Sequence, residues 1–168
     1  MVDPAQALAR FDAGAPIRLD ELTGRWRGRG LPTGSRLDGL LEAYGWYGKE
    51  VLDAETVHPL LFRDARGRPR AVDPAHAPLA VLRRAPGLAR TPVARAGFAV
   101  LRPLRYTRGP GARVRRVEHR GVVSAALVYD RLPIVDVLRR VVAGTLIGVM
   151  DLRGVPAPFF FLLRRDDF

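Results

Sequence analysis

The stretch that decides the fold is Gly24-Arg25-Trp26-Arg27-Gly28-Arg29-Gly30. Its residues alternate, because the arginines take every second position and Trp26 shares the other positions with glycines. A period of two predicts a half-buried strand whose arginine face meets water. Glycine inside a strand indicates a bend or the close approach of another group. We therefore expect a curved sheet in which Trp26 is a plug that closes one end of the core.

Length and composition indicate one folded domain over residues 1–168. The chain is 48% hydrophobic, and no apolar run approaches the roughly 20 residues that a membrane-spanning helix needs. An acidic residue, Asp3, lies close to the start, and no secretory signal is visible. Cysteine is absent, which excludes disulfides, thiolate zinc sites and cysteine nucleophiles. We expect a cytoplasmic protein.

Positive charge is concentrated in one third of the chain. Residues 63–120 carry 15 basic and three acidic residues, within a net charge of +11 for the whole chain. Such a segment indicates either a solvated basic face or a surface for peripheral contact with an anionic membrane. Only Phe98 and Tyr106 supply aromatic rings there, and no nucleic-acid-binding motif is present. A nucleic-acid partner is therefore not expected.

Helix signals occur at the start of the chain and after the first strand. Asp3 followed by Pro4 predicts an N-terminal helix that Gly14 ends. Ser35 and Asp38 form a capping box, and the following leucines have helical spacing. The sequence thus predicts a second helix over residues 35–44.

The remaining periodic segments are rich in strand-forming residues. Strands are predicted over 46–52, 57–62, 114–119, 122–129, 145–150 and 159–163, whereas 134–142 suits either a strand or a short helix. Residues 65–110 form an irregular, partly helical insert between residues 1–64 and a strand-rich half at 111–168, with helical turns near 78–84 and 93–101. The apolar run at 159–163 indicates a strand that is covered on both faces. The fold class expected is mainly β (α+β), as a closed antiparallel β-barrel with these two helices.

Several motifs give the chain a resemblance to a known family. They are Gly24–Gly28, Thr33-Gly34, Trp46–Lys49, Val57–Phe62, Glu118–Gly121, Tyr129–Asp136, Leu146–Asp151 and Phe160–Leu162. With them the chain resembles the bacterial family named for its GXWXG box, paired with a C-terminal domain of unknown function. The resemblance implies that both halves build one calycin-like barrel, similar to lipocalins and fatty-acid-binding proteins. One departure is Val137-Leu138, where the family usually has an aromatic residue after Asp136.

Lysine occurs once in the chain, because 27 of the 28 basic residues are arginine. A lysine is a compact point charge, so Lys49 is a candidate ligand contact. The candidate ligand-binding residues are Trp46, Tyr47, Lys49, His58, His119, Tyr129, Asp136 and Phe160. We expect the barrel to bind or transport a small hydrophobic or amphipathic ligand, such as a fatty acid or phospholipid. Lys49, with His58 or His119, would meet its polar or anionic head.

Two other functions stay open at this point. An isomerase or cyclase could use Lys49 or the pair Tyr129 and Asp130 as acid–base groups. Asp130 and Asp136 also suit turn and capping roles. A haem-binding barrel is a third possibility, because nitrobindin-like barrels share the Gly-x-Trp-x-Gly-x-Gly strand, although no histidine follows His119 here. No metal site or cofactor is predicted, and the sequence leaves the ligand's identity and the oligomeric state open.

Overall fold

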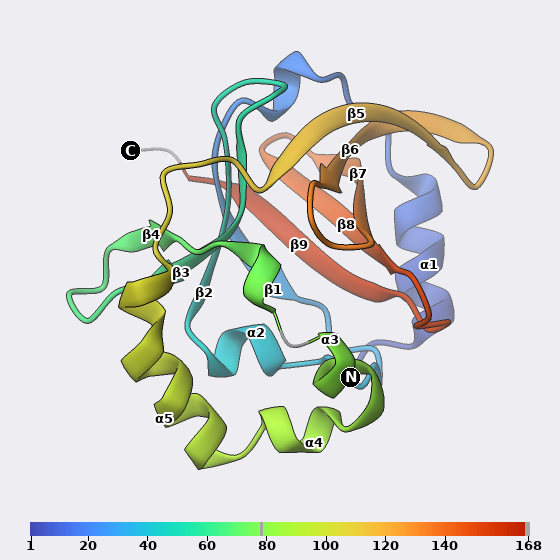
Figure 1. Cartoon of the computed structure of the whole chain (residues 1–168). Helices are drawn as coiled ribbons and strands as arrows, with labels where there is room; N and C mark the ends of the chain where they lie inside the picture. The colour runs from blue at the N-terminus through green and yellow to red at the C-terminus, as the bar shows by residue number, and fades with distance from the viewer. Residues whose placement is uncertain (78, 167–168) are drawn as a thin grey trace.

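The strands of the protein join into one antiparallel sheet whose ends meet. The computed structural model describes residues 1–77 and 79–166, and within them nine strands pair in the order β2-β1-β9-β8-β7-β6-β5-β3-β4. Because β2 also pairs with β3, eight of these nine strands form a closed ring, and β4 lies at its edge (Figure 1). The strands are β1 (Gly24–Gly30), β2 (Trp46–Val51), β3 (Val57–Arg63), β4 (Pro69–Ala71), β5 (Ala112–His119), β6 (Val122–Tyr129), β7 (Ile134–Val142), β8 (Thr145–Leu152) and β9 (Phe159–Arg165).

Short helices lie outside the strands, with α1 beside β7 and β8 and the others grouped near α2 (Figure 1). The helices are α1 (Pro4–Ala13), α2 (Leu40–Ala43), α3 (Leu79–Arg84), α4 (Pro86–Ala89) and α5 (Pro92–Leu101), with 3-10 turns η1 (Asp20–Leu22), η2 (Pro74–His76) and η3 (Arg102–Arg105). The Asp3 carboxylate accepts a hydrogen bond from the Ala5 amide, and Gly14 caps the other end of α1. The N-terminal helix is therefore confirmed, as are the helical turns expected within residues 65–110.

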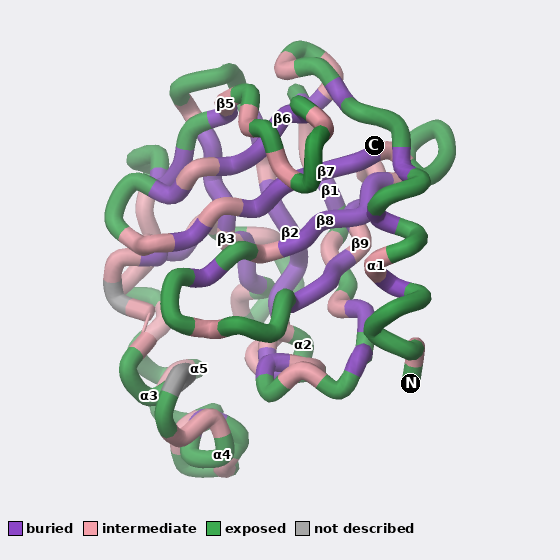
Figure 2. The backbone as a smooth tube through the Cα atoms, turned by 90° about the vertical axis from the view of Figure 1, so that its right-hand side faces the viewer, coloured by how far each residue is buried: buried purple, intermediate pink, exposed green. Residues whose placement is uncertain are grey.

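Buried residues recur along the strands (Figure 2), and they form two clusters. The larger cluster lies in the interior of the ring, and the smaller one lies between the outer face and α1. Strand β9 contributes residues to both clusters, because Phe159 and Phe161 face the interior whereas Phe160 packs in the outer cluster with Phe11 of α1. The prediction that this strand is covered on both faces is confirmed.

The glycines of β1 and β2 allow other groups, an aromatic ring at Gly28 and a neighbouring strand at Gly48, to approach the backbone closely. A Cβ atom on Gly28 would lie 2.2 Å from the Trp46 ring, and Gly48, at φ +148°, lies directly against the Trp26 carbonyl oxygen. Trp26 itself is 2% exposed in the interior cluster, and its indole N–H donates to the Leu22 carbonyl. The alternation in the GXWXG stretch therefore predicted a real strand, and close approach explains its glycines.

The helix expected over residues 35–44 is much shorter than predicted. Residues 36–39 form a turn, and only α2 (Leu40–Ala43) is helical. Gly39 has φ +70°, a left-handed conformation that interrupts a right-handed helix. The Asp38 carboxylate accepts from the amides of Thr33 and Gly34, so it caps the preceding loop and not a longer helix. The predicted capping box is wrong for this reason.

Two further points complete the fold. The ambiguous segment 134–142 is strand β7, which pairs with both β6 and β8. In the part of the chain that the structure describes, no helix is both long enough and apolar enough to cross a membrane.

Candidate functional site

A bulge in β2 directs Lys49 into the interior of the ring. The pairing of β2 with β3 shifts register on both sides of Gly48, so strict alternation is lost there. As a result Trp46 and Lys49, three positions apart, both reach the interior, whereas Glu50 pairs with Arg25 on the outside. Lys49 is only 3% exposed. The chain thus places its one lysine in the core.

Lys49 forms a hydrogen-bonded cluster with Tyr129 and Asp136. Its side-chain nitrogen lies 2.8 Å from Asp136 Oδ2, 3.2 Å from the Tyr129 hydroxyl and 3.1 Å from the Pro59 carbonyl oxygen. The Tyr129 hydroxyl in turn donates to Asp136 Oδ2 at 3.1 Å. An ammonium group has three hydrogens, so these three acceptors use them all.

Because side chains alternate along β6 and β7, Tyr129 and Asp136 both point into the interior. Asp136 lies between Ile134 and Leu138, which both belong to the interior cluster, and Tyr129 ends β6 on the same face. Asp136 is 1% exposed, and among the described residues no donor pairs with its second oxygen, Oδ1. The cluster therefore holds one buried carboxylate oxygen with unused capacity to accept a hydrogen bond.

Aromatic rings surround the ammonium group. Lys49 Nζ lies 5.0 Å from the ring centre of Phe161, 5.7 Å from that of Trp46 and 5.6 Å from that of Tyr129. These distances suit cation–π attraction. Trp46 and Phe161 also meet edge to face, at 6.3 Å between centres. The charged cluster is thus enclosed by apolar rings.

The Tyr129 hydroxyl is held in its protonated form. Burial raises its pKa well above the ordinary value, and the nearby Asp136 carboxylate raises it further by repulsion and by accepting its hydrogen bond. Tyr129 is therefore a hydrogen-bond donor throughout the neutral range. The cluster combines a cation, an anion and a neutral donor within hydrogen-bond distance.

Two of the predicted aromatic residues lie outside the ring. Tyr47 points outward, where its hydroxyl donates to Asp166 and the guanidinium groups of Arg27 and Arg63 lie near its ring. Phe160 packs under α1 in the outer cluster. Both face away because successive strand residues alternate, and the bulge at Gly48 separates Tyr47 from Lys49. The structure does not bring them to the cluster.

The two predicted histidines also lie elsewhere. His58 pairs with Glu50 across β2 and β3, so it shares the outward face of that residue. His119 stacks edge to face on Phe11 of α1, at 5.8 Å between ring centres, and burial lowers its pKa. Neither histidine faces the interior, so the haem alternative gains no support from them.

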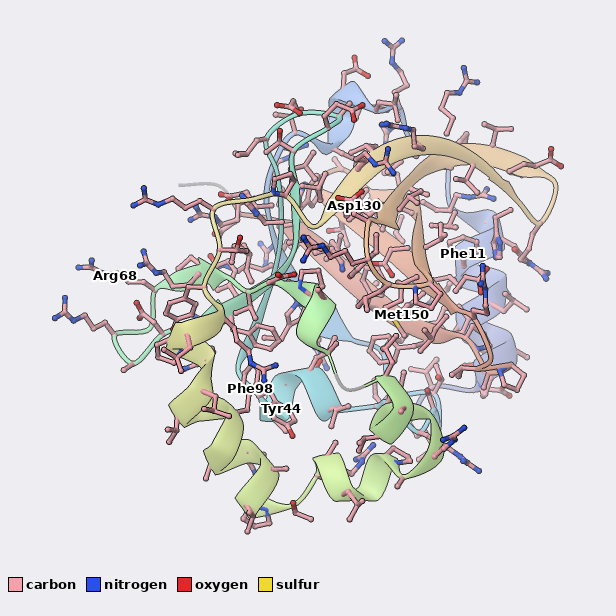
Figure 3. All side chains as sticks on the ribbon, in the orientation of Figure 1. Phe11, Tyr44, Arg68, Phe98, Asp130 and Met150 are labelled. Atoms are coloured by element: carbon pink, nitrogen blue, oxygen red, sulfur yellow. The ribbon has the colours of Figure 1, made fainter. Side chains whose placement is uncertain are left out.

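Asp130 is a surface residue and not a partner of Tyr129 in the cluster. It lies in the loop after β6 (Figure 3) and pairs with Arg113 at 2.8 Å. Among the described residues, no group of three or more histidine, aspartate or glutamate side chains is arranged to hold a metal ion.

Sequence reasoning missed Phe161 and the Pro59 carbonyl. The sequence predicts Phe160 as a ligand contact, but the run at 159–163 is apolar on both faces and so does not indicate which of its residues point inward. The register of β9 on β1, which opposes Gly30 to Phe161 and Gly28 to Leu163, is the signal that identifies them. The Pro59 carbonyl could not be predicted in this way, because every residue has a backbone carbonyl and its use does not depend on the type of residue.

Fold and site together define the class of protein. It is a mainly β protein whose antiparallel strands close into a ring, and this ring encloses a buried lysine, tyrosine and aspartate among aromatic side chains. Two family models match the chain, as the sequence motifs predicted: the model described as "GXWXG protein" matches residues 9–67, and the "Domain of unknown function (DUF4334)" model matches residues 110–165.

A solved structure, described as "Crystal structure of protein from Thermomonospora curvata", is similar over nearly the whole chain. It has a TM-score of 0.74 and 31% sequence identity, covering 99% of this chain and 89% of that one. The comparison with curated proteins gave no match.

Proposed function

We propose that the ring of strands is a calycin-like β-barrel that binds a small hydrophobic or amphipathic ligand, of lipid type, in its interior. The observation that carries this proposal is the cluster of Lys49, Tyr129 and Asp136, which is polar and charged within an otherwise apolar core. A buried ion pair adds little stability compared with apolar side chains of the same volume, because both charges lose their hydration. Its presence is better explained by a polar ligand group that it recognises.

The surroundings of the cluster support an amphipathic ligand. Trp46 and Phe161 offer apolar surface next to the charged groups, which is the combination typical of small-molecule sites. The absence of cysteine is consistent with the cytoplasmic location expected from the sequence.

Intrinsic fluorescence can test the proposal, because the chain has only two tryptophans. In a Trp26→Phe variant, Trp46 beside Lys49 is the sole reporter, and titration with decan-1-ol or decanoate is expected to change its emission. In a Trp46→Phe variant the reporter is Trp26, whose ring lies next to Arg165 and whose indole N–H donates to the Leu22 carbonyl, so it is expected to respond less. Native mass spectrometry of the purified protein gives an independent readout. If neither measurement detects binding of any of the apolar ligands tested, the proposal is contradicted.

An enzyme of the isomerase or cyclase type is the second candidate. The Tyr129 hydroxyl, kept protonated by burial, and the Asp136 carboxylate next to it form a donor and an acceptor within 3.1 Å. In this candidate mechanism Asp136 is the acid–base partner of Tyr129, in place of Asp130, which the sequence predicts for that role. Conversion of a bound ligand that stops in Asp136→Asn but continues in Arg113→Ala would favour catalysis over binding.

A peripheral contact with anionic membranes is a further part of the proposal. Large apolar side chains are exposed along the segment from α4 to η3, which we call the α4–η3 surface: Leu88, Val93, Val100, Leu101 and Leu104. Val93 and Leu104 are 82% and 83% exposed, and no acidic residue occurs between Asp73 and Glu118. Exposed valines and leucines beside arginines suit an anionic lipid surface better than nucleic acid, which would need aromatic rings for stacking.

The same surface borders a hollow of about 440 Å³ between α2 and α5, where Tyr44 and Phe98 meet edge to face at 5.0 Å (Figure 3). Co-sedimentation with phosphatidylcholine vesicles, with and without phosphatidylglycerol, tests the contact. We expect binding only to the anionic vesicles, weakened by salt. Val93→Glu is expected to reduce it, whereas Val142→Glu, at an exposed position of β7, is the matched control. Equal binding to both kinds of vesicle, or equal effects of the two variants, would contradict it.

A further inference from the structure

The hydrogen-bonding capacity of the cluster is used unequally. Every hydrogen of the Lys49 ammonium already has an acceptor, in Asp136 Oδ2, the Tyr129 hydroxyl and the Pro59 carbonyl. The Tyr129 hydrogen is directed at Asp136 Oδ2 as well. The donors of the cluster are therefore all engaged within the chain.

The unused capacity belongs to an acceptor. Asp136 Oδ1 is buried and, among the described residues, has no donor as partner. Its strand neighbours across the sheet are Leu127 and Met150, and both pack in or against the interior cluster. A buried oxygen that is left without a donor carries a desolvation penalty, which a ligand donor removes.

We infer that the ligand presents a hydrogen-bond donor, such as an alcohol hydroxyl, to Asp136 Oδ1, and that an ionised carboxylate is disfavoured. This inference rests on the proposed binding function and refines it. A carboxylate head has no hydrogen to offer, and it would meet the negative charge of Asp136. It could reach Lys49 only by displacing one of the three acceptors that the lysine already holds. An alcohol needs no such rearrangement.

Three probes with the same ten-carbon chain test the inference: decan-1-ol, its methyl ether 1-methoxydecane, and decanoate at pH 7.5. The ether keeps the oxygen of the alcohol and lacks only its hydrogen. We expect decan-1-ol to bind at least roughly tenfold tighter than either of the others, which corresponds to about 1.4 kcal/mol. Dissociation constants are measured from Trp46 emission in the Trp26→Phe variant and by calorimetry on the unaltered protein.

A variant provides a second readout. In Asp136→Asn the oxygen is neutral and an N–H₂ donor is added, so the preference for alcohol over decanoate is expected to fall below about threefold. Arg113→Ala, outside the cluster, is the matched control and is expected to retain the preference. The comparison of the three probes needs no substitution, so it stands even where Asp136→Asn fails to fold.

The outcomes separate the two proposals. Equal binding of the three probes, or tightest binding of decanoate, overturns the donor inference and leaves the binding function in place. Binding of none of them overturns both. A tenfold preference for the alcohol over decanoate that persists in Asp136→Asn also overturns the inference, because the charge of Asp136 would then not be what disfavours the carboxylate.

Discussion

The side-chain nitrogen of Lys49 lies 2.8 Å from Oδ2 of Asp136, although the two residues are 87 positions apart in the chain. Lys49 comes from β2 and Asp136 from β7, two strands that do not pair with each other. The contact therefore crosses the interior of the ring and exists only because the ring closes. It joins the segment that the GXWXG model matches to the segment that the DUF4334 model matches at one buried point.

Removing one member of this pair is expected to destabilise the protein strongly. Lys49→Met leaves a buried carboxylate without its cation, which should cost about 3–5 kcal/mol of unfolding free energy. The double variant Lys49→Met/Asp136→Leu removes both charges and is expected to recover most of that loss. Urea denaturation followed by circular dichroism measures both.

The pair of Arg113 and Asp130 provides the matched control, because its side chains are 46% and 30% exposed. Arg113→Ala should cost no more than about 1 kcal/mol, as exposed pairs usually do. A similar small cost for Lys49→Met would show that Asp136 is not held as a buried anion.

Tyr129 should make stability depend on alkaline pH. Its pKa is raised in the folded protein by burial and by Asp136, so the unfolded chain releases this proton first as the pH rises through its ordinary value of 10.0. The stability that Tyr129 contributes is thus complete below pH 10 and is lost above it. We expect the unaltered protein to lose about 1 kcal/mol more than Tyr129→Phe between pH 9 and 11. Parallel losses in urea titrations at the two pH values would contradict this.

Gly28→Ala should disturb the site through packing. The added Cβ would lie 2.2 Å from the Trp46 ring, so the ring must move, at an expected cost of about 1–3 kcal/mol. Trp46 emission in the Trp26→Phe background is expected to change with it. A Cβ atom added at Gly97 of α5 would meet no other atom of the described residues within 4 Å, its own helix backbone aside. Gly97→Ala should therefore raise the free energy of unfolding by about 0.5–1 kcal/mol. Equal effects at both glycines would argue against the close approach.

The loop before α2 offers a test of its observed cap. Asp38 accepts hydrogen bonds from the Thr33 and Gly34 amides at 2.8 and 2.7 Å, whereas Ser35 accepts one from Leu37 at 3.3 Å. Asp38→Ala is therefore expected to cost about 1 kcal/mol or more in thermal or urea unfolding, and Ser35→Ala less. The reverse order would restore the capping box that the sequence indicated.

The sequence predicted the strands well because strand signals are local. Alternation in Gly24–Gly30, the turn at Arg120-Gly121 and the apolar run at 159–163 each indicate structure from adjacent residues. The helix at 35–44 failed because Gly39 takes a left-handed conformation, and the capping pattern around it cannot reveal this.

For the site, residue type was a good guide and side-chain direction was not. The rarity of lysine indicated Lys49, and Trp46, Tyr129 and Asp136 do meet it in the interior. Tyr47 and Phe160 were plausible by type, yet each lies one position away from an inward-facing residue. In a strand one position is the difference between two faces.

The sequence by itself determined which segments become strands and which side chain is unusual, because periodicity and composition act over neighbouring residues. Only the tertiary structure decided that Lys49 turns inward at the bulge beside Gly48 and meets Asp136. The register shift depends on how β2 pairs with β3, and the meeting depends on ring closure. The register shift is set by pairing between neighbouring strands and the meeting by a contact between residues 87 positions apart, and the residue pattern within one strand encodes neither.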